Sequence, residues 1–242
     1  MGLGYPARLL FLLPIVNFTI SNVQIELCRA EELSPDLFHR IQSGTTTQND
    51  ISRMEKSLNT VCEVPNRSTG GVLENGDHWT PLTAALASSR YSLAAFLIGR
   101  GTDVNKTTFR GYSPLWIICN SVDGDSPSAV DLCMLLLKSG ANTELSPVKQ
   151  VCPPFDIRPL HVACLRGNLE ILKLLSNKGI AVDAVDSSGA GALHYAKIGK
   201  RLAANTNIKG QDRSKKVALF DKLITIVQRY QSPNESTADD GP

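Results

Sequence analysis

From residue 80 to residue 230, apolar side chains recur in short runs that have the spacing of one helix face. The runs come in pairs, and the second run of a pair ends at a glycine: Gly101, Gly140 or Gly179. A glycine is typical of the position just after a helix, where it adopts a left-handed conformation at little cost. The pattern therefore predicts pairs of short α-helices joined by tight turns.

A tripeptide that returns along the chain marks the start of these pairs. It reads TPL at residues 80–82, SPL at 113–115, RPL at 158–160 and GAL at 191–193, in steps of 33, 45 and 33 residues. Thr80 is a typical helix N-cap, and Pro81 fits the first helical position because its missing N–H would have no partner there. These units are a sequence repeat, and neighbouring repeats must bury the apolar faces of one another.

The third unit identifies the type of repeat best. Residues 158–189 read RPLHVACLRGNLEILKLLSNKGIAVDAVDSSG. This resembles an ankyrin repeat, with its T-P-L-H-x-A start, an interhelical glycine, an apolar second helix and a hairpin turn. The resemblance covers about four repeats in residues 77–230. It implies an all-α ankyrin-repeat solenoid of helix pairs with short β-hairpin turns.

Three stretches depart from the regular repeat. Residues 121–128 lie between the two helices of the second unit, and residues 146–156 follow its hairpin turn. Both are expected to be surface loops, either functional or disordered. Residues 199–216 replace the glycine turn of the fourth unit, before a capping helix expected over residues 217–230. Residues 231–242 are expected to be a flexible tail.

Helical spacing also precedes the repeats. Ser34-Pro35-Asp36 predicts a helix start, and the apolar face that follows stops at Gly44. Residues 50–64 have a second apolar face before Pro65. Residues 34–76 are therefore expected to form a helical cap and a linker.

Residues 1–33 have two interpretations. Arg8 and the apolar residues 9–16 have the general shape of a secretory signal, although no small-x-small cleavage pattern follows. Alternatively, apolar residues alternate on both sides of Ser21-Asn22, which is typical of a two-residue β-hairpin turn. The chain also has N-x-S/T sequons, which matter only if it is exported, at Asn17, Asn66, Asn105 and Asn234.

Composition and charge narrow the functional classes. A hydrophobic content of 42% with 20% charged residues is that of a globular protein, and a net charge of +2 argues against a polyanion-coating protein. No apolar run reaches the length of about 18 residues that a membrane-spanning helix needs. The six cysteines include no C-x-x-C pair, which disfavours zinc fingers and thioredoxin-type sites.

No sequence motif supports catalysis, a cofactor or a metal site. Phosphate-binding glycine loops, H-E-x-x-H motifs and paired carboxylates are missing from the sequence. His161 and Cys164 share a helix face, as a nucleophilic pair would, but the resemblance implies that His161 is a structural, hydrogen-bonding residue. A metal site with His194, one repeat later, is disfavoured because Trp116 and Thr83 fill that position in other units.

The resemblance also implies a protein-binding surface. In ankyrin repeats, the residues before the tripeptide and those near the end of the first helix line the concave face and the hairpin tips. In this chain they are Asp77, Trp79, Phe109, Arg110, Tyr112, Asn120, Leu165 and Arg166. Trp, Tyr and Arg are frequent anchors of protein interfaces. Trp79 and Tyr112 have an alternative role in packing on neighbouring hairpins, and the two roles are compatible.

A basic segment lies in the fourth unit. Its cations are Lys197, Lys200, Arg201, Lys209, Arg213, Lys215 and Lys216, against one acid, Asp212. Such a segment suits an acidic partner or nuclear import, or is simply a solvated loop. Nucleic-acid binding is disfavoured, because no aromatic residues are interleaved with these cations.

The expected function is non-enzymatic binding of a protein partner by a preordered scaffold or adaptor, in the cytoplasm or the nucleus. One alternative is an ankyrin protein of the secretory pathway whose amino-terminal signal is removed. A further alternative is a substrate receptor of a ubiquitin-ligase assembly, although no recruiting motif is recognisable after Tyr230.

Overall fold

The structure is a computed structural model of the chain, and it describes residues 35–60, 62–63, 78–108, 110–147, 156–205 and 210–231. The helices are α1 (Pro35–Ser43), α2 (Gln48–Lys56), α3 (Pro81–Ala87), α4 (Tyr91–Gly99), α5 (Pro114–Cys119), α6 (Pro127–Lys138), α7 (Pro159–Arg166), α8 (Leu169–Asn177), α9 (Ala192–Asn205) and α10 (Gly210–Gln231). The strands are β1 (Cys62–Glu63) and β2 (His78–Trp79).

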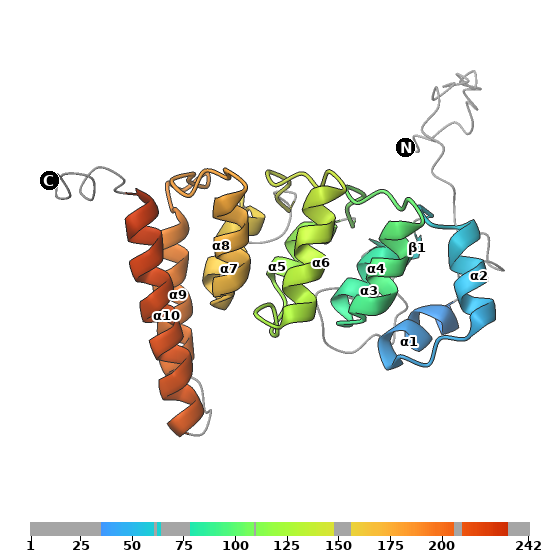
Figure 1. The fold of residues 1–242 in the computed structure, drawn as a ribbon, viewed down its shortest axis with the longest axis horizontal. Coiled ribbons are helices and arrows are strands. Elements are labelled where there is room, and N and C mark those ends of the chain that lie inside the picture. The colour runs from blue at the N-terminus through green and yellow to red at the C-terminus, as the bar shows by residue number, and fades with distance from the viewer. Residues whose placement is uncertain are drawn as a thin grey trace, which may run out of the picture.

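The helices stack in pairs along one axis (Figure 1). The first helices of the pairs contact one another in the order α1, α3, α5, α7 and α9, and the second helices α4, α6 and α8 do the same. This is the arrangement of an all-α solenoid of helix pairs. The predicted fold is therefore confirmed.

Local geometry confirms the predicted helix starts at Thr80 and Ser113 and the predicted stop at Gly140. Thr80 Oγ1 accepts a hydrogen bond from the backbone N–H of Thr83 (3.2 Å), and Ser113 Oγ accepts one from that of Trp116 (3.1 Å). Each hydroxyl thereby satisfies a donor that the helix start leaves without a partner. Gly140, just after α6, has φ of 85°, a backbone conformation that a side chain would strain.

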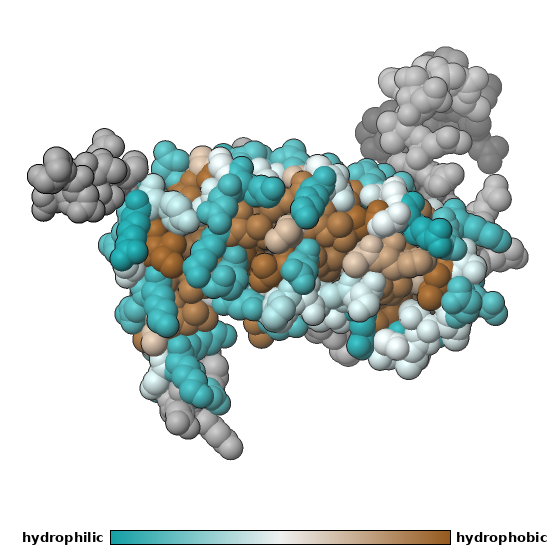
Figure 2. Space-filling model, in the orientation of Figure 1, coloured by the Kyte–Doolittle hydropathy of each residue, from teal (hydrophilic) through white to brown (hydrophobic). Residues whose placement is uncertain are grey.

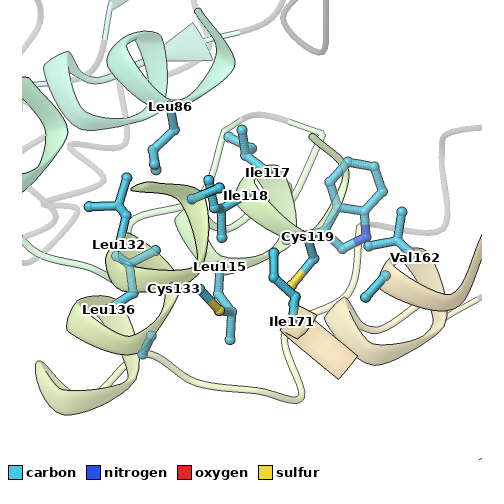
Figure 3. Packing of buried hydrophobic residues seen from close by; sticks show 14 of the residues in the cluster. Leu86, Leu115, Ile117, Ile118, Cys119, Leu132, Cys133, Leu136, Val162 and Ile171 are labelled. Atoms are coloured by element: carbon cyan, nitrogen blue, oxygen red, sulfur yellow. The ribbon is translucent and has the colours of Figure 1, made fainter. Parts of the chain in front are cut away.

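The core lies between successive pairs and continues along the stack. Figure 3 shows its middle, where Leu115 and Ile118 of α5, Leu136 of α6 and Ile171 of α8 belong to one cluster, each with 0% of its surface exposed. Complete burial of such a side chain stabilises the fold by about 1.5–3 kcal/mol. Because the cluster draws on different units, no unit buries its apolar face alone.

The amino-terminal pair α1–α2 packs on the first repeat at the end of the stack. Helix α2 ends at Lys56, so the prediction of a helix over residues 50–64 is wrong at its carboxyl end. Strand β1 instead pairs antiparallel with β2, directly before α3. The partner of β1 lies far along the chain, so local apolar spacing could not reveal this pairing.

Some predictions fall on residues that the structure does not describe. These are the two interpretations of residues 1–33, the linker at 66–76, most of the insert at 146–156, and the tail at 232–242. Helix α10 ends at Gln231, next to the predicted start of that tail.

The carboxyl-terminal pair is longer than the others and projects beyond them (Figure 1). Helix α9 continues to Asn205 and α10 already starts at Gly210, so residues 199–205 and 210–216 of the predicted insert are helical. The interpretation of the basic segment as a solvated loop is wrong for these residues. Gly199 permits the long helix, because a Cβ there would lie 2.3 Å from the Leu165 carbonyl oxygen and 2.5 Å from the Phe220 ring. Helix α9 thus passes closely between α7 and α10 without a break.

Candidate functional site

A cleft of about 370 Å³ opens where the first helices of three repeats end. We call it the inner cleft. Its apolar lining is Leu86 and Ala87 from α3 and Ile117 from α5, with Val122 at the edge. Its polar lining consists of Ser89, Asn120, Ser121, Asp123 and Arg166. The cleft therefore combines an apolar floor with a polar rim, which is the usual composition of a binding site.

Two residues predicted for binding meet in this cleft. Arg166 Nε donates a hydrogen bond to Asn120 Oδ1 over 2.7 Å, from the end of α7 to the end of α5. Asn120 is buried, whereas Arg166 is exposed. The bond uses one of the five N–H donors of the guanidinium and fixes its orientation. Arg166 is thereby a preoriented cation at the cleft.

The loop at residues 121–126 forms one wall of the cleft, and Tyr91 of α4 holds it from the first repeat. The Tyr91 hydroxyl lies 2.9 Å from Ser121 Oγ and donates to Asp123 Oδ1 over 2.9 Å. Ser121 Oγ also donates to Asp123 Oδ1 (2.6 Å). Burial would raise the pKa of Asp123, but these hydroxyl donors outweigh it and lower the pKa. Asp123 thus stays ionised at neutral pH and is already hydrogen-bonded.

Asn168 holds the same loop from the third repeat. Its Nδ2 donates to the carbonyl oxygens of Cys119 (2.9 Å) and Ser121 (3.0 Å). Asp125 Oδ1 accepts a further hydrogen bond from the backbone N–H of Glu170 (2.9 Å). The loop is therefore anchored on both sides, and it presents Val122 with 83% of its surface exposed.

Val122, Ser121 and Asp123 are site residues that the sequence prediction missed. The available signal was the insert at 121–128, which interrupts the repeat at this point. The insert was expected to be either functional or disordered. The structure shows a loop held by hydrogen bonds up to Ser126, which caps α6 through a bond from Ala129 N–H (3.3 Å).

The predicted site residues near the hairpins lie apart from the hydrogen-bonded pair of the cleft. Tyr112 is half-buried and stacks on Trp116, with ring centroids 4.4 Å apart. Trp116 Nε1 in turn donates to the carbonyl oxygen of Ile157 (2.9 Å). Arg110 is also half-buried, and so is Leu165, which lies directly before Arg166 at the end of α7. Asp77 and Phe109 lie outside the described residues.

Trp79 is in the core and has 1% of its surface exposed. Its ring lies 5.1 Å from that of Phe38, so it packs between α1 and the first repeat. In this position Trp79 offers no surface to a partner, and packing is the role that the structure supports for it.

His161 has a structural role, as the resemblance implied. Its Nδ1 accepts a hydrogen bond from the Arg158 backbone N–H (3.4 Å), which leaves Nε2 to donate to the Ala184 carbonyl oxygen (2.9 Å). The ring is fully buried and stacks on Tyr195 at 5.1 Å. Burial raises the pKa of the Cys164 thiol to about 12. Cys164 therefore stays protonated at neutral pH and is a poor nucleophile.

The described residues offer neither a cluster of metal ligands nor a helix that could span a membrane. The His, Cys, Asp and Glu side chains of this part of the chain include no group of three that could hold a metal ion. None of its helices combines the length and the apolar character that crossing a membrane requires.

Comparison with known proteins matches a repeat family to the part of the chain that contains the α5 and α7 side of the cleft. Residues 115–207, which include α5 to α9, match the family model of ankyrin repeats (3 copies). A Danio rerio protein named "Putative palmitoyltransferase ZDHHC13" is 26% identical over 125 residues, which is 52% of this chain. The matched part is only 18% of that relative's length.

Proposed function

Residues 115–207 of this chain are ankyrin repeats, and from this premise we propose that the chain binds a protein partner in the inner cleft without catalysing a reaction. Ankyrin repeats are in general a non-enzymatic interaction fold. The observation that carries the proposal is the anchored loop 121–126, which presents the exposed Val122 beside the apolar floor of the cleft. Val122 extends the apolar floor formed by Leu86, Ala87 and Ile117, and an exposed apolar patch with a polar rim is typical of an interaction site.

The lining of the inner cleft favours a partner segment with an apolar anchor next to an acid. A volume of about 370 Å³ accommodates a large apolar side chain against Leu86 and Ile117. Arg166 lies at the same cleft and is oriented by Asn120, so a neighbouring carboxylate gains a charge-assisted hydrogen bond. Asp123 is already occupied by hydroxyl donors, which limits its repulsion of that acid.

Preordering supports the same proposal. The loop that carries Val122 is held by Tyr91 on one side and Asn168 on the other. A surface that is ordered before binding loses little conformational entropy when the partner arrives. Tyr112 and Arg110 on the hairpin side remain candidates for further contacts of a longer partner segment.

A photo-crosslinking experiment tests the proposal directly. A benzoylphenylalanine residue at position 122 is expected to crosslink a specific protein in the native extract, and Arg166→Glu is expected to abolish that crosslink. The matched control is the same probe at Val185, a half-exposed apolar residue that forms a β-bridge with Gly191 before α9. If both positions crosslink the same proteins, or if Arg166→Glu leaves the crosslink unchanged, the inner cleft is not the binding site.

We further propose that the chain acts in a reducing compartment such as the cytoplasm or nucleus. Cys119, Cys133 and Cys164 are free thiols in the core, and free thiols are kept in reducing compartments. Amino-terminal sequencing of the native protein and a glycosidase mobility shift test this. A processed amino terminus together with a glycan would support the secretory alternative instead.

A further inference from the structure

The projecting pair α9–α10 has several cations that form no ion pair with the described carboxylates. We call the following cations the basic arm: Lys197 and Arg201 of α9, and Arg213, Lys215 and Lys216 of α10. All are exposed except Lys216, which is half-buried. Their neighbour Lys200 is paired with Asp221. The cations of the basic arm have no carboxylate partner among the residues that the structure describes.

The position of Arg213 is unfavourable for the helix itself. Arg213 lies in the first turn of α10, which begins at Gly210, and Lys215 and Lys216 follow in the second turn. The amino-terminal end of a helix has positive partial charge, so a cation in the first turn is destabilising, and the effect falls off in the second. Only Asp212 opposes it in the first turn. A charge cluster whose first member works against folding points to a use outside the fold.

Helix α9 has an apolar stripe next to a stripe of basic residues. Leu202 has 57% of its surface exposed, and Ile198, one helical turn earlier, is half-buried. Lys197 and Arg201 have the same spacing of four residues and therefore form an adjacent stripe of the same helix. The packing of α9 on α10 instead uses the other side, where Ala203 and Phe220 are buried.

We propose that the basic arm is a docking surface for an acidic amphipathic helix of a partner protein. An apolar residue of that helix packs on Leu202, and its carboxylates face the cations of the basic arm. Nucleic acid fits less well, because Phe220 is buried and the exposed Tyr230 lies at the opposite end of α10 from Arg213, Lys215 and Lys216. This surface is separate from the inner cleft, so the two proposals can fail independently.

The proposal is tested with the full chain and a labelled synthetic helix that has glutamates on one face and leucines on the other. The triple variant Arg213→Glu, Lys215→Glu and Lys216→Glu is expected to raise the Kd for this peptide by roughly tenfold or more, measured by fluorescence anisotropy. The matched control reverses the same amount of charge elsewhere, with Lys106→Glu, Lys138→Glu and Lys178→Glu. It is expected to change the Kd less than about twofold.

Two further readouts separate an acidic helix from other anions. Leu202→Ser is expected to weaken peptide binding about threefold and to leave binding of a DNA duplex unchanged, since only the peptide has an apolar residue to pack there. Val185→Ser, the matched change at an exposed apolar residue outside both surfaces, is expected to leave the Kd for the peptide unchanged. The proposal is overturned if the control variant loses as much affinity as the triple variant. It is also overturned if a DNA duplex or phosphatidylserine vesicles bind more tightly than the peptide does.

Discussion

Two junctions of the stack meet the same requirement with different side chains. The amino-terminal junction joins the end of α1 to the first repeat, and the central junction joins the end of α5 to the third repeat. At each junction a first helix ends and leaves carbonyl oxygens that need donors. Asn168 supplies them at the central junction, through hydrogen bonds to Cys119 and Ser121. Arg90, which lies 78 residues earlier at the equivalent repeat position, donates to the carbonyls of Ile41 (3.3 Å) and Gln42 (2.7 Å) at the end of α1. The repeat position thus preserves a hydrogen-bonding role and not a residue type.

The two junctions also differ in how much they depend on single side chains. The preceding residue is left-handed in both, but it is Gly167 (φ of 82°) at the central junction and Ser89 (φ of 53°) at the amino-terminal one, where a side chain adds strain. Both junctions lie within the continuous apolar cluster, but the amino-terminal junction is at its end, where Phe38 packs on Trp79. We therefore expect the amino-terminal pair to be the more vulnerable part.

The largest effect is expected from Trp79→Ala. Removal of a fully buried Trp is expected to lower the free energy of unfolding by about 3–5 kcal/mol, because it leaves a cavity against Phe38. Urea unfolding followed by circular dichroism measures this. Val122→Ala, at an exposed position, is the control and should stay within about 0.5 kcal/mol of wild type. A loss below about 1 kcal/mol for Trp79→Ala would instead favour its role at a surface.

A smaller effect is expected from removing the donors that join the units. Asn168→Ala leaves the buried Cys119 carbonyl oxygen without this donor and should lower the free energy of unfolding by about 2 kcal/mol. Arg90→Ala should lower it by only about 1 kcal/mol, because the shorter bond goes to the carbonyl oxygen of Gln42, a half-buried residue where water can replace the donor. Denaturant titration of both variants gives the ranking. If Arg90→Ala costs more than Asn168→Ala, the difference that we draw between the two junctions is wrong.

The smallest effect on stability is expected only at acidic pH and only in the amino-terminal pair α1–α2. Burial would raise the pKa of Asp50, but two hydrogen bonds from Arg40 (2.7 and 3.0 Å) and one from the Thr47 backbone N–H (2.9 Å) lower it to about 2. The folded pKa is below the ordinary value of 3.8. The stability from this carboxylate is therefore fully present above about pH 4 and is lost as the pH falls through about 2.

Trp79 reports this loss locally, in a Trp116→Phe background. Its fluorescence is expected to change between about pH 4 and pH 2 in the parent protein, as the amino-terminal pair loosens. Asp50→Asn should remove most of that pH dependence. A global melt would be less informative, because hydrogen bonds from Ser188, Tyr195 and Ala190 also lower the pKa of Asp186 against its burial. A transition of equal size in Asp50→Asn would show that another group is responsible.

The repeat frame was predictable from the sequence because its signals are local. A hydroxyl and a Pro at a helix start, the apolar spacing and the glycine after a helix all act within one or two turns, and the structure has them at Thr80, Ser113 and Gly140. The candidate site was predictable only in part. Asn120 and Arg166 follow from their place in the repeat, whereas Val122 lies on an insert that the repeat pattern leaves undefined.

What the sequence determined by itself is therefore the solenoid of helix pairs, since each pair is encoded by short-range spacing. Only the tertiary structure decided which surfaces the solenoid exposes. It buried Trp79 against Phe38, joined Arg166 to Asn120, and let α9 continue past Gly199 into a projecting arm. These outcomes depend on contacts between residues far apart in the chain, and the pattern along one segment carries no information about the segment that packs against it.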